Sequence, residues 1–391
     1  MTARAPLRVA FTMIPRRLWA GGYNYQSNLF AALNRYRQGE ITSVVFAGEQ
    51  DEAADLGDLA LIPGVETVQS AAFNRRRAGL ARSLLLGLDQ AAVAEFRKQK
   101  VDVIFESARF FGWRLPYPVV AWFPDFQHRR LPQLFSQAAR WKREIGFRAQ
   151  IASGRSIMLS SESALRDCQK FYPGVANRTS VVRFATQPLP DLLTAIPPDV
   201  IRHYGLSSRF FYMPNQFWRH KNHQTVIDAL TILAKSRVDV VVAASGSPVD
   251  LREPHYFDSI MRQVKARGLE KNFRYLGMIP LPHVYALLRA TTALINPSRF
   301  EGWSTTVEEA KSFGVPMILS EIDVHREQAA GAARYFGVDD PVMLADLLSY
   351  VSQNPGPVTV RNLLPNLDRR VATFADDFVS TIRRTFTTLA D

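Results

Sequence analysis

The segment 296–320, "NPSRFEGWSTTVEEAKSFGVPMILS", places two carboxylates, Glu301 and Glu309, on either side of a turn of small residues. The turn is predicted to lead from a buried strand into a helix that ends at Gly314. A helix N-terminus attracts phosphate through its dipole and its unpaired N–H groups. The flanking carboxylates can accept hydrogen bonds from sugar hydroxyls. The segment therefore has the groups needed to hold a ligand with phosphates in the middle and hydroxyls at both ends.

Each acidic side chain of this segment has an expected role. Glu309 lies about 100° around the helix from Glu308 and leans toward the helix start, so it could bind a ribose. Glu301 precedes the turn and could bind the hydroxyls of a second sugar. The residues expected to line the donor site between them, in part through backbone N–H groups, are Gly302, Trp303, Ser304, Thr305 and Thr306. Thr305 and Glu308 also have capping-box spacing, so a helix that is merely capped is the alternative.

A second candidate group is the basic loop 219–221, which follows the predicted strand 210–214. Arg219 or Lys221 at this strand end could stabilise the charge that develops on a diphosphate leaving group. A solvated basic loop is the alternative, above all for Arg219. The sequence has no D-x-D spacing, so we expect cations and a helix dipole to take the place of a divalent metal ion.

Two further groups lie in the N-terminal half of the chain. Gly21 and Gly22 would allow a phosphate to approach the backbone, and Asn24 is a suitable N-cap for the next helix. A tight turn explains the two glycines equally well. Asp125 and His128 follow the predicted strand 119–123 and could contact an acceptor hydroxyl or the donor sugar. A turn aspartate and an exposed histidine are the alternatives.

Short apolar runs alternate with helix-length segments in two series, which indicates two parallel sheets with helical crossovers. The candidate strands of the two series are 7–14, 41–48, 101–107, 119–123 and 156–161, then 210–214, 238–245, 273–277, 291–298 and 315–320. The Pro-rich segment 183–200 separates the series. We therefore expect an α/β fold of two doubly wound, Rossmann-like domains that face each other across a cleft. Ligands of such sheets bind beyond the carboxyl ends of the strands.

The composition limits the possible environments and partners. One cysteine, Cys168, excludes internal disulfides and cysteine-based zinc sites. The start of the sequence lacks a signal-peptide core and no apolar run is long enough for a membrane span, so a cytoplasmic protein is expected. The net charge of +12 favours a nucleotide, a nucleic acid or an acidic membrane as partner. Segment 140–151 mixes Trp, Phe and Ile with cations and could lie on an anionic membrane.

With these features, the chain resembles the retaining GT-B glycosyltransferases of family 4, also called group 1. Segment 300–328 fits the family's E-x7-E motif and its Gly-x-Pro turn, and "KNHQTVIDAL" fits the segment that holds the phosphate-binding lysine. The resemblance implies that Glu309 binds the donor ribose, Glu301 the transferred sugar and Lys221 the diphosphate. Gly22 would approach the diphosphate, and the backbone of Met278 would meet the nucleobase.

The resemblance also implies a domain arrangement. Residues 1–188 would form the acceptor-side domain, onto which the helix 371–391 crosses back, and residues 189–370 the donor-side domain. Two departures from the family pattern stand out. Asn215-Gln216 replaces a Gly-Arg pair, so Arg219 could supply the missing cation, and Pro124-Asp125 replaces a His-Asp pair, so Asp125 or His128 would take that role.

The expected function is therefore a metal-independent, retaining hexosyltransferase without a cofactor, acting in surface polysaccharide synthesis. The donor would be a GDP- or UDP-linked sugar, with mannose slightly favoured, and the acceptor a glycan or a lipid-linked glycan at the inner face of the plasma membrane. Two alternatives stay open. One is a nucleic-acid-modifying glycosyltransferase or DNA-binding protein, which the absence of a DNA-reading motif disfavours. The other is a nucleotide-sugar epimerase or a non-catalytic sugar-binding homologue.

Overall fold

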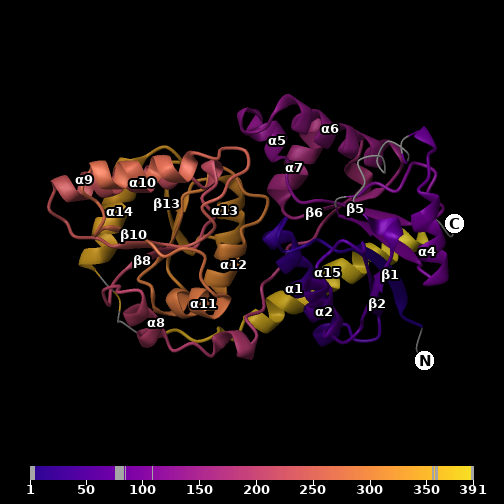
Figure 1. The fold of residues 1–391 in the computed structure, drawn as a ribbon, viewed down its shortest axis with the longest axis horizontal. Coiled ribbons are helices and arrows are strands. Elements are labelled where there is room, and N and C mark those ends of the chain that lie inside the picture. Colours follow the sequence, from indigo (N-terminus) through magenta and orange to yellow (C-terminus); the bar gives the residue numbers. More distant parts are fainter. Residues whose placement is uncertain are drawn as a thin grey trace. The chain divides into compact units, whose positions relative to one another are not determined.

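The computed structural model describes residues 5–74, 83, 85–107, 109–354, 356 and 360–388, and Figure 1 labels its helices and strands. The chain forms two compact units. The N-terminal unit comprises Met1–Phe126, Gln137–Ala185 and Asp368–Asp391, and the C-terminal unit comprises Gln127–Ser136 and Thr186–Leu367. The sequence placed the boundaries after residues 188 and 370, and it did not anticipate that residues 127–136 group with the C-terminal unit.

The N-terminal unit is built on a parallel sheet of 7 strands in the order β3-β2-β1-β4-β5-β6-β7. The strands are β1 (Leu7–Thr12), β2 (Ile41–Ala47), β3 (Val65–Gln69), β4 (Val103–Glu106), β5 (Val119–Phe123), β6 (Ser156–Leu159) and β7 (Thr179–Val181). The central strands β4 and β5 are buried along their whole length. Such strands need helices on both faces, which the crossover connections supply.

The helices of this unit follow the strands in sequence. They are α1 (Ala20–Tyr36), α2 (Ala53–Ala60), α4 (Gln90–Lys98), α6 (Gln137–Ala152), α7 (Glu162–Phe171) and the C-terminal α15 (Leu367–Thr387), with short 3-10 turns η1 (Ala71–Phe73) and η3 (Ala176–Arg178). Phe374, Phe378 and Ile382 recur every four residues and give α15 its buried face. Phe378 of α15 packs on Phe11 of β1 and Phe105 of β4, with ring centroids 6.1 and 5.6 Å apart, so the end of the chain completes the core of the first unit (Figure 1).

The C-terminal unit contains a parallel sheet of 6 strands in the order β10-β9-β8-β11-β12-β13. The strands are β8 (Phe211–Met213), β9 (Val242–Ala244), β10 (Phe273–Tyr275), β11 (Leu294–Asn296), β12 (Met317–Ser320) and β13 (Ala333–Phe336). The order reverses direction between β8 and β11, the first and fourth strands of the unit. The two loops that leave these strands therefore diverge to opposite sides of the sheet, and this is where doubly wound sheets bind ligands.

Helices cover the second sheet as well. They are α8 (Pro197–His203), α9 (His223–Lys235), α10 (Tyr256–Ala266), α11 (Leu281–Ala290), α12 (Thr305–Ser312), α13 (Asp323–Ala329) and α14 (Pro341–Gln353), with the 3-10 turns η4 (Pro190–Leu193) and η5 (Arg219–Lys221). The segment Gln127–Ser136, which groups with this unit, contains α5 (Gln127–Arg130) and the 3-10 turn η2 (Pro132–Leu134). Among the described residues, no helix is both long and apolar enough to cross a membrane.

The expectation of two doubly wound α/β sheets is confirmed. Each predicted strand is present, β5 with the predicted bounds and the others in a shorter form. Three strands were missed: β3, β7 and β13. β3 and β13 include exposed positions and β7 is only partly buried, so none has a continuous apolar run. Strands at or near a sheet edge are harder to detect because polar side chains interrupt their hydrophobic pattern.

We expect the substitution Phe378→Ala to destabilise the N-terminal unit by about 3–5 kcal/mol, since it removes a fully buried ring and leaves a cavity. Urea unfolding, followed by near-UV circular dichroism, would give the change in free energy of unfolding. Arg369→Ala, at an exposed position of the same helix, is the control and should change it by no more than about 0.5 kcal/mol. Equal effects of the two substitutions would contradict the core role of α15.

Candidate active site

The switch point of the second sheet is bridged by two buried asparagines. Asn215 follows β8, Asn296 ends β11, and Asn215 Nδ2 donates to Asn296 Oδ1 over 3.2 Å. Asn296 Nδ2 in turn donates to Ser304 Oγ at 2.9 Å and to Thr306 Oγ1 at 3.2 Å. These bonds fix the first turn of α12 to the end of the sheet. They also satisfy Asn215 Nδ2 and the amide of Asn296, groups that would be costly to bury alone, whereas Asn215 Oδ1 has no partner among the described residues.

Lys221 and Glu301 meet beside this bridge. Lys221 Nζ lies 2.6 Å from Glu301 Oε1, and both side chains are largely buried. The lysine comes from the loop after β8 and the glutamate from the loop after β11. The ion pair therefore links the two loops at the switch point of the sheet. Ser298 Oγ lies 2.7 Å from Glu301 Oε1 and 2.7 Å from Asn296 Oδ1. The structure thus brings together two residues for which the sequence predicted catalytic roles.

The N-cap of α12 is Ser304, whose Oγ accepts from the N–H of Val307. The capping box expected at Thr305 is therefore wrong by one residue, because the helix begins at Thr305 itself. The Ser304 N–H donates to Gln328 Oε1 at 3.1 Å, and Gln328 Nε2 donates back to the Ser304 carbonyl at 2.8 Å. The N–H groups of Thr305 and Thr306, two of the residues expected to line the donor site, have no acceptor among the described residues.

Glu309 and its neighbour Glu308 have different environments. Glu308 is bonded to Lys311 Nζ at 2.8 Å and to Gln328 Nε2 at 3.0 Å. Glu309 is only 6% exposed, and within the described part of the chain it has no hydrogen-bond or ion-pair partner. Burial raises the pKa of the Glu309 carboxyl to about 8. In the free protein this carboxyl is therefore mostly protonated at neutral pH and can still form hydrogen bonds.

His325 is a buried residue near Glu301 that the sequence analysis missed. Its Nδ1 lies 2.9 Å from the carbonyl oxygen of Ser320, and a carbonyl can only accept, so Nδ1 carries the proton. Nε2 is then an acceptor, and it has no partner among the described residues. Burial lowers the pKa of His325 to about 4, although the charge of Glu301 partly opposes this shift. His325 and Gln328 both lie in the segment 300–328, but no spacing rule distinguished them there.

Arg219, Gln216 and Asn215, where the sequence departs from the family pattern, make contacts within the protein. The Arg219 guanidinium lies 2.8 Å from Glu253 Oε1, and its side chain is more than half exposed. Gln216 Oε1 accepts from the N–H of Ser247 at 2.6 Å, and Asn215 belongs to the bridge described above. Met278, after β10, is 67% exposed.

His223 has a structural environment. Its ring stacks on Phe217 with centroids 4.0 Å apart, and burial lowers the pKa of His223 to about 3. The neighbouring His220 is also buried, and burial lowers the pKa of its imidazole. Both rings are therefore neutral, and both are buried beneath the loop that follows β8.

In the N-terminal unit, α1 begins at Ala20, so Gly21 and Gly22 lie in its first turn. Asn24 is inside the helix and the N-cap is Trp19, which corrects the expectation that Asn24 caps this helix. A Cβ at Gly22 would lie 2.4 Å from the Trp19 indole, too close for any other residue without a shift of the ring. Close packing of an aromatic ring thus accounts for this glycine.

The other predicted residues of the N-terminal half fall on either side of the division between units. Asp125 belongs to the N-terminal unit, where its Oδ1 accepts from the Arg143 guanidinium at 3.1 Å. His128 is buried in α5, within the segment that groups with the C-terminal unit.

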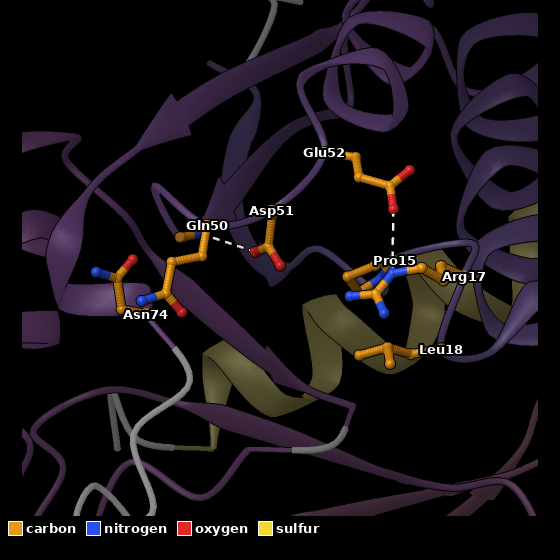
Figure 2. Close-up of a pocket in the computed structure, with 8 residues that line it drawn as sticks. Pro15, Arg17, Leu18, Gln50, Asp51, Glu52 and Asn74 are labelled. Carbon is orange, nitrogen blue, oxygen red and sulfur yellow. Dashed lines mark hydrogen bonds and ion pairs between the residues drawn. The ribbon is translucent and has the colours of Figure 1, made fainter.

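A pocket of about 180 Å³ lies at the carboxyl ends of β1 and β2 in the N-terminal unit (Figure 2). Its lining residues are mostly polar: Pro15, Arg17, Leu18, Gly48, Gln50, Asp51, Glu52 and Asn74. Arg17 Nε and Glu52 Oε1 are 3.2 Å apart, and Asp51 accepts from the N–H of Gly48 at 2.9 Å. The sequence analysis did not identify this pocket, because its residues come from three separate segments.

Comparisons with known proteins agree with this architecture. Residues 205–362 match the family model of the glycosyl transferases group 1. The O-antigen biosynthesis glycosyltransferase WclY of Escherichia coli is 26% identical over 136 residues, 35% of each chain. The O-antigen chain mannosyltransferase B of Escherichia coli is 36% identical over 69 residues, 17% of each chain. The matched segments thus cover about a third or less of these curated relatives.

A solved structure matches over nearly the whole length. Anabaena Alr3699/HepE, crystallised in complex with UDP-glucose, has a TM-score of 0.63 at 17% identity, covering 98% of this chain and 99% of that one. The two doubly wound units and this likeness define a protein with the GT-B fold of glycosyltransferases. Within that fold, the part of the chain that carries Lys221, Glu301 and Glu309 lies inside the match to the family model of the glycosyl transferases group 1.

The raised pKa of Glu309 predicts a pH-dependent stability. In the folded state the carboxyl loses its proton near pH 8 and in the unfolded state near pH 4.5. The folded state therefore binds more protons between these values, and this group makes stability fall as the pH rises through that window. A glutamine does not titrate. We expect Glu309→Gln to raise the melting temperature by several degrees at pH 8 and above, and the gain to shrink toward pH 5.

Differential scanning fluorimetry across this pH range would measure the difference between variant and wild type. Glu270→Gln, at an exposed position of the same unit, is the matched control and should give a difference that is small and independent of pH. A flat profile for Glu309→Gln would show that the carboxyl is ionised at little cost in the folded protein.

Proposed function

We propose that this protein is a retaining, metal-independent glycosyltransferase that moves a sugar from a nucleoside-diphosphate sugar to a glycan or lipid-linked acceptor in surface polysaccharide synthesis. The observation that carries the proposal is the meeting of Lys221 with Glu301 at the switch point. It occurs beside a helix N-terminus whose first N–H groups, like the buried carboxyl of Glu309, have no partner among the residues that the structure describes. This set of groups is complementary to a nucleotide sugar.

The donor is expected to bind along the first turn of α12. Ribose hydroxyls would donate to Glu309, and the diphosphate would accept from the N–H groups of Thr305 and Thr306. Lys221 carries three donors on Nζ, so it can bind a phosphate oxygen while it keeps a bond to Glu301. Glu301 retains a second carboxylate oxygen, which can accept from the hydroxyls of the transferred sugar.

In the proposed reaction, the acceptor hydroxyl attacks the anomeric carbon from the face that the diphosphate leaves. The bond between the anomeric carbon and the phosphate oxygen breaks, the new glycosidic bond forms on the same face, and a phosphate oxygen takes the hydroxyl proton. The negative charge on the leaving diphosphate grows during this step. Lys221 and the N-terminus of α12 lie where that charge can be stabilised, and such preorganised groups supply much of an enzyme's rate enhancement.

The names of similar proteins support the proposed donor and acceptor classes. A structural neighbour binds UDP-glucose, and two relatives act in O-antigen synthesis, one as a mannosyltransferase. We therefore propose a GDP- or UDP-linked hexose as donor and a cytoplasmic site of action. Arg219 would add a second cation to the diphosphate if its side chain left Glu253.

Nucleotide binding can be tested by thermal stabilisation with GDP, UDP, ADP and dTDP and with their common sugar conjugates. A ligand at 100 times its Kd should stabilise the protein by about 2.7 kcal/mol. One nucleotide series should give a selective shift that Glu309→Ala abolishes and that Glu270→Ala leaves unchanged. No shift with any nucleotide in a folded sample would contradict the proposed donor site.

Lys221→Ala should lower kcat by about 10²–10³-fold, the loss typical of removing one group that stabilises a developing anion. Release of nucleotide from the donor identified by stabilisation would be followed with and without acceptor extracts. Lys265→Ala, at an exposed position of α10, should leave kcat unchanged. A near-normal kcat for Lys221→Ala would exclude this lysine from the chemical step.

A further inference from the structure

Helix α6 (Gln137–Ala152) of the N-terminal unit has one face fixed by specific contacts. The Phe147 ring stacks on Phe123 with centroids 4.0 Å apart and planes 11° apart. Glu144 Oε2 accepts from the hydroxyl of Tyr172 at 2.8 Å. Gln150 Nε2 donates to Glu106 Oε2 at 3.2 Å. These contacts come from three successive turns, so the inner face of the helix is defined along most of its length.

The opposite face of α6 exposes large apolar side chains. Trp141 is 65% exposed and Ile145 is 46% exposed. The two residues are four positions apart and therefore lie on the same side of the helix, with the exposed Ala138 one turn before them. An isolated exposed apolar residue needs no explanation, but a tryptophan and an isoleucine aligned on one helix face form a surface that water solvates poorly.

The charged side chains that α6 itself exposes beside this apolar face are all positive. Arg140, Lys142 and Arg148 are exposed beside it, and neither Arg140 nor Lys142 has an ionic partner in the described part of the chain. The helix has one acidic residue, Glu144, which is turned inward and bound by the Tyr172 hydroxyl and by Arg148 Nε at 2.6 Å. The outer face of α6 therefore presents apolar side chains and cations, and no carboxylate of its own helix.

We propose that this face of α6 docks on the surface of an anionic lipid bilayer. Trp141 and Ile145 would enter the headgroup region, where tryptophan is preferred, and the three cations would lie against lipid phosphates. The net charge of +12 for the whole chain adds long-range attraction to such a surface. Nothing in this step depends on the proposed sugar transfer, so the two can fail separately.

A second copy of this chain is a less suitable occupant of the same face. In a symmetric dimer the patch would meet itself, because such interfaces use the same surface on both subunits. Arg140, Lys142 and Arg148 would then oppose their own copies, and like charges disfavour association. A bilayer with anionic headgroups offers the complementary charge instead.

The test is binding of the full chain to vesicles, measured by co-sedimentation at low and physiological salt. Vesicles would contain phosphatidylcholine alone or mixed with phosphatidylglycerol. We expect binding to the anionic vesicles only. The double variant Arg140→Gln/Lys142→Gln should reduce the partition coefficient about fivefold per cation removed. Trp141→Ser/Ile145→Ser should reduce it by at least as much.

Leu61→Ser is the matched control, since Leu61 is a strongly exposed apolar residue of the same unit, at the end of α2. It should leave vesicle binding unchanged. Melting temperatures would confirm that all variants fold. In wild type, brominated lipids should quench part of the tryptophan fluorescence, and Trp141→Ser should remove that quenching.

Three results would overturn the proposal. The first is no binding to anionic vesicles, and the second is binding that Trp141→Ser/Ile145→Ser leaves unaltered, which would reflect the net charge alone. The third is concentration-dependent self-association in sedimentation velocity that the same variant abolishes, with no vesicle binding. That result would assign the face to a second copy of the chain.

Discussion

The candidate active site depends on the reversal of strand order between β8 and β11. Neighbouring parallel strands whose crossovers run in opposite directions leave a crevice at their carboxyl ends, because their loops diverge. The hydrogen bond between Asn215 and Asn296 closes the base of that crevice, and the bonds from Asn296 to Ser304 and Thr306 position the helix that rises from it. The N-terminal end of α12 is therefore held by the sheet itself as well as by its own loop.

The three glutamates of segment 301–309 have three different environments. Glu301 faces a cation at 2.6 Å, and Glu308 is bound by Lys311 and Gln328. Glu309 has neither kind of partner in the described part of the chain, and burial raises its pKa. The sequence shows only three glutamates within nine positions. Their separation into an ion-paired carboxylate, a structural carboxylate and an unpaired carboxyl results from residues far away along the chain, and from the side of α12 to which each belongs.

This distance along the chain explains what could be predicted from the sequence. The helical and strand periods identified the two α/β units and most buried strands, since those patterns are local. Lys221 and Glu301 are 80 positions apart. The family resemblance implied a role for each of them, but the sequence did not predict that they are in contact. Gln328 and His325 were missed because their importance comes from α13 packing against α12. The cap at Ser304 was predicted one residue late, at Thr305, since Thr is also a common N-cap residue.

The Lys221–Glu301 pair also has a consequence for competition inside a cell. Inorganic phosphate and many phosphorylated metabolites are anions that could occupy an open cationic site. Here any phosphate that approaches Lys221 must share it with a carboxylate already in contact, and an anion without hydroxyl groups offers nothing to the carboxylate in return. A nucleotide sugar brings both kinds of group at once. In the proposed donor site, this ion pair would therefore disfavour simple anions through charge alone, before any fit of base or sugar is considered.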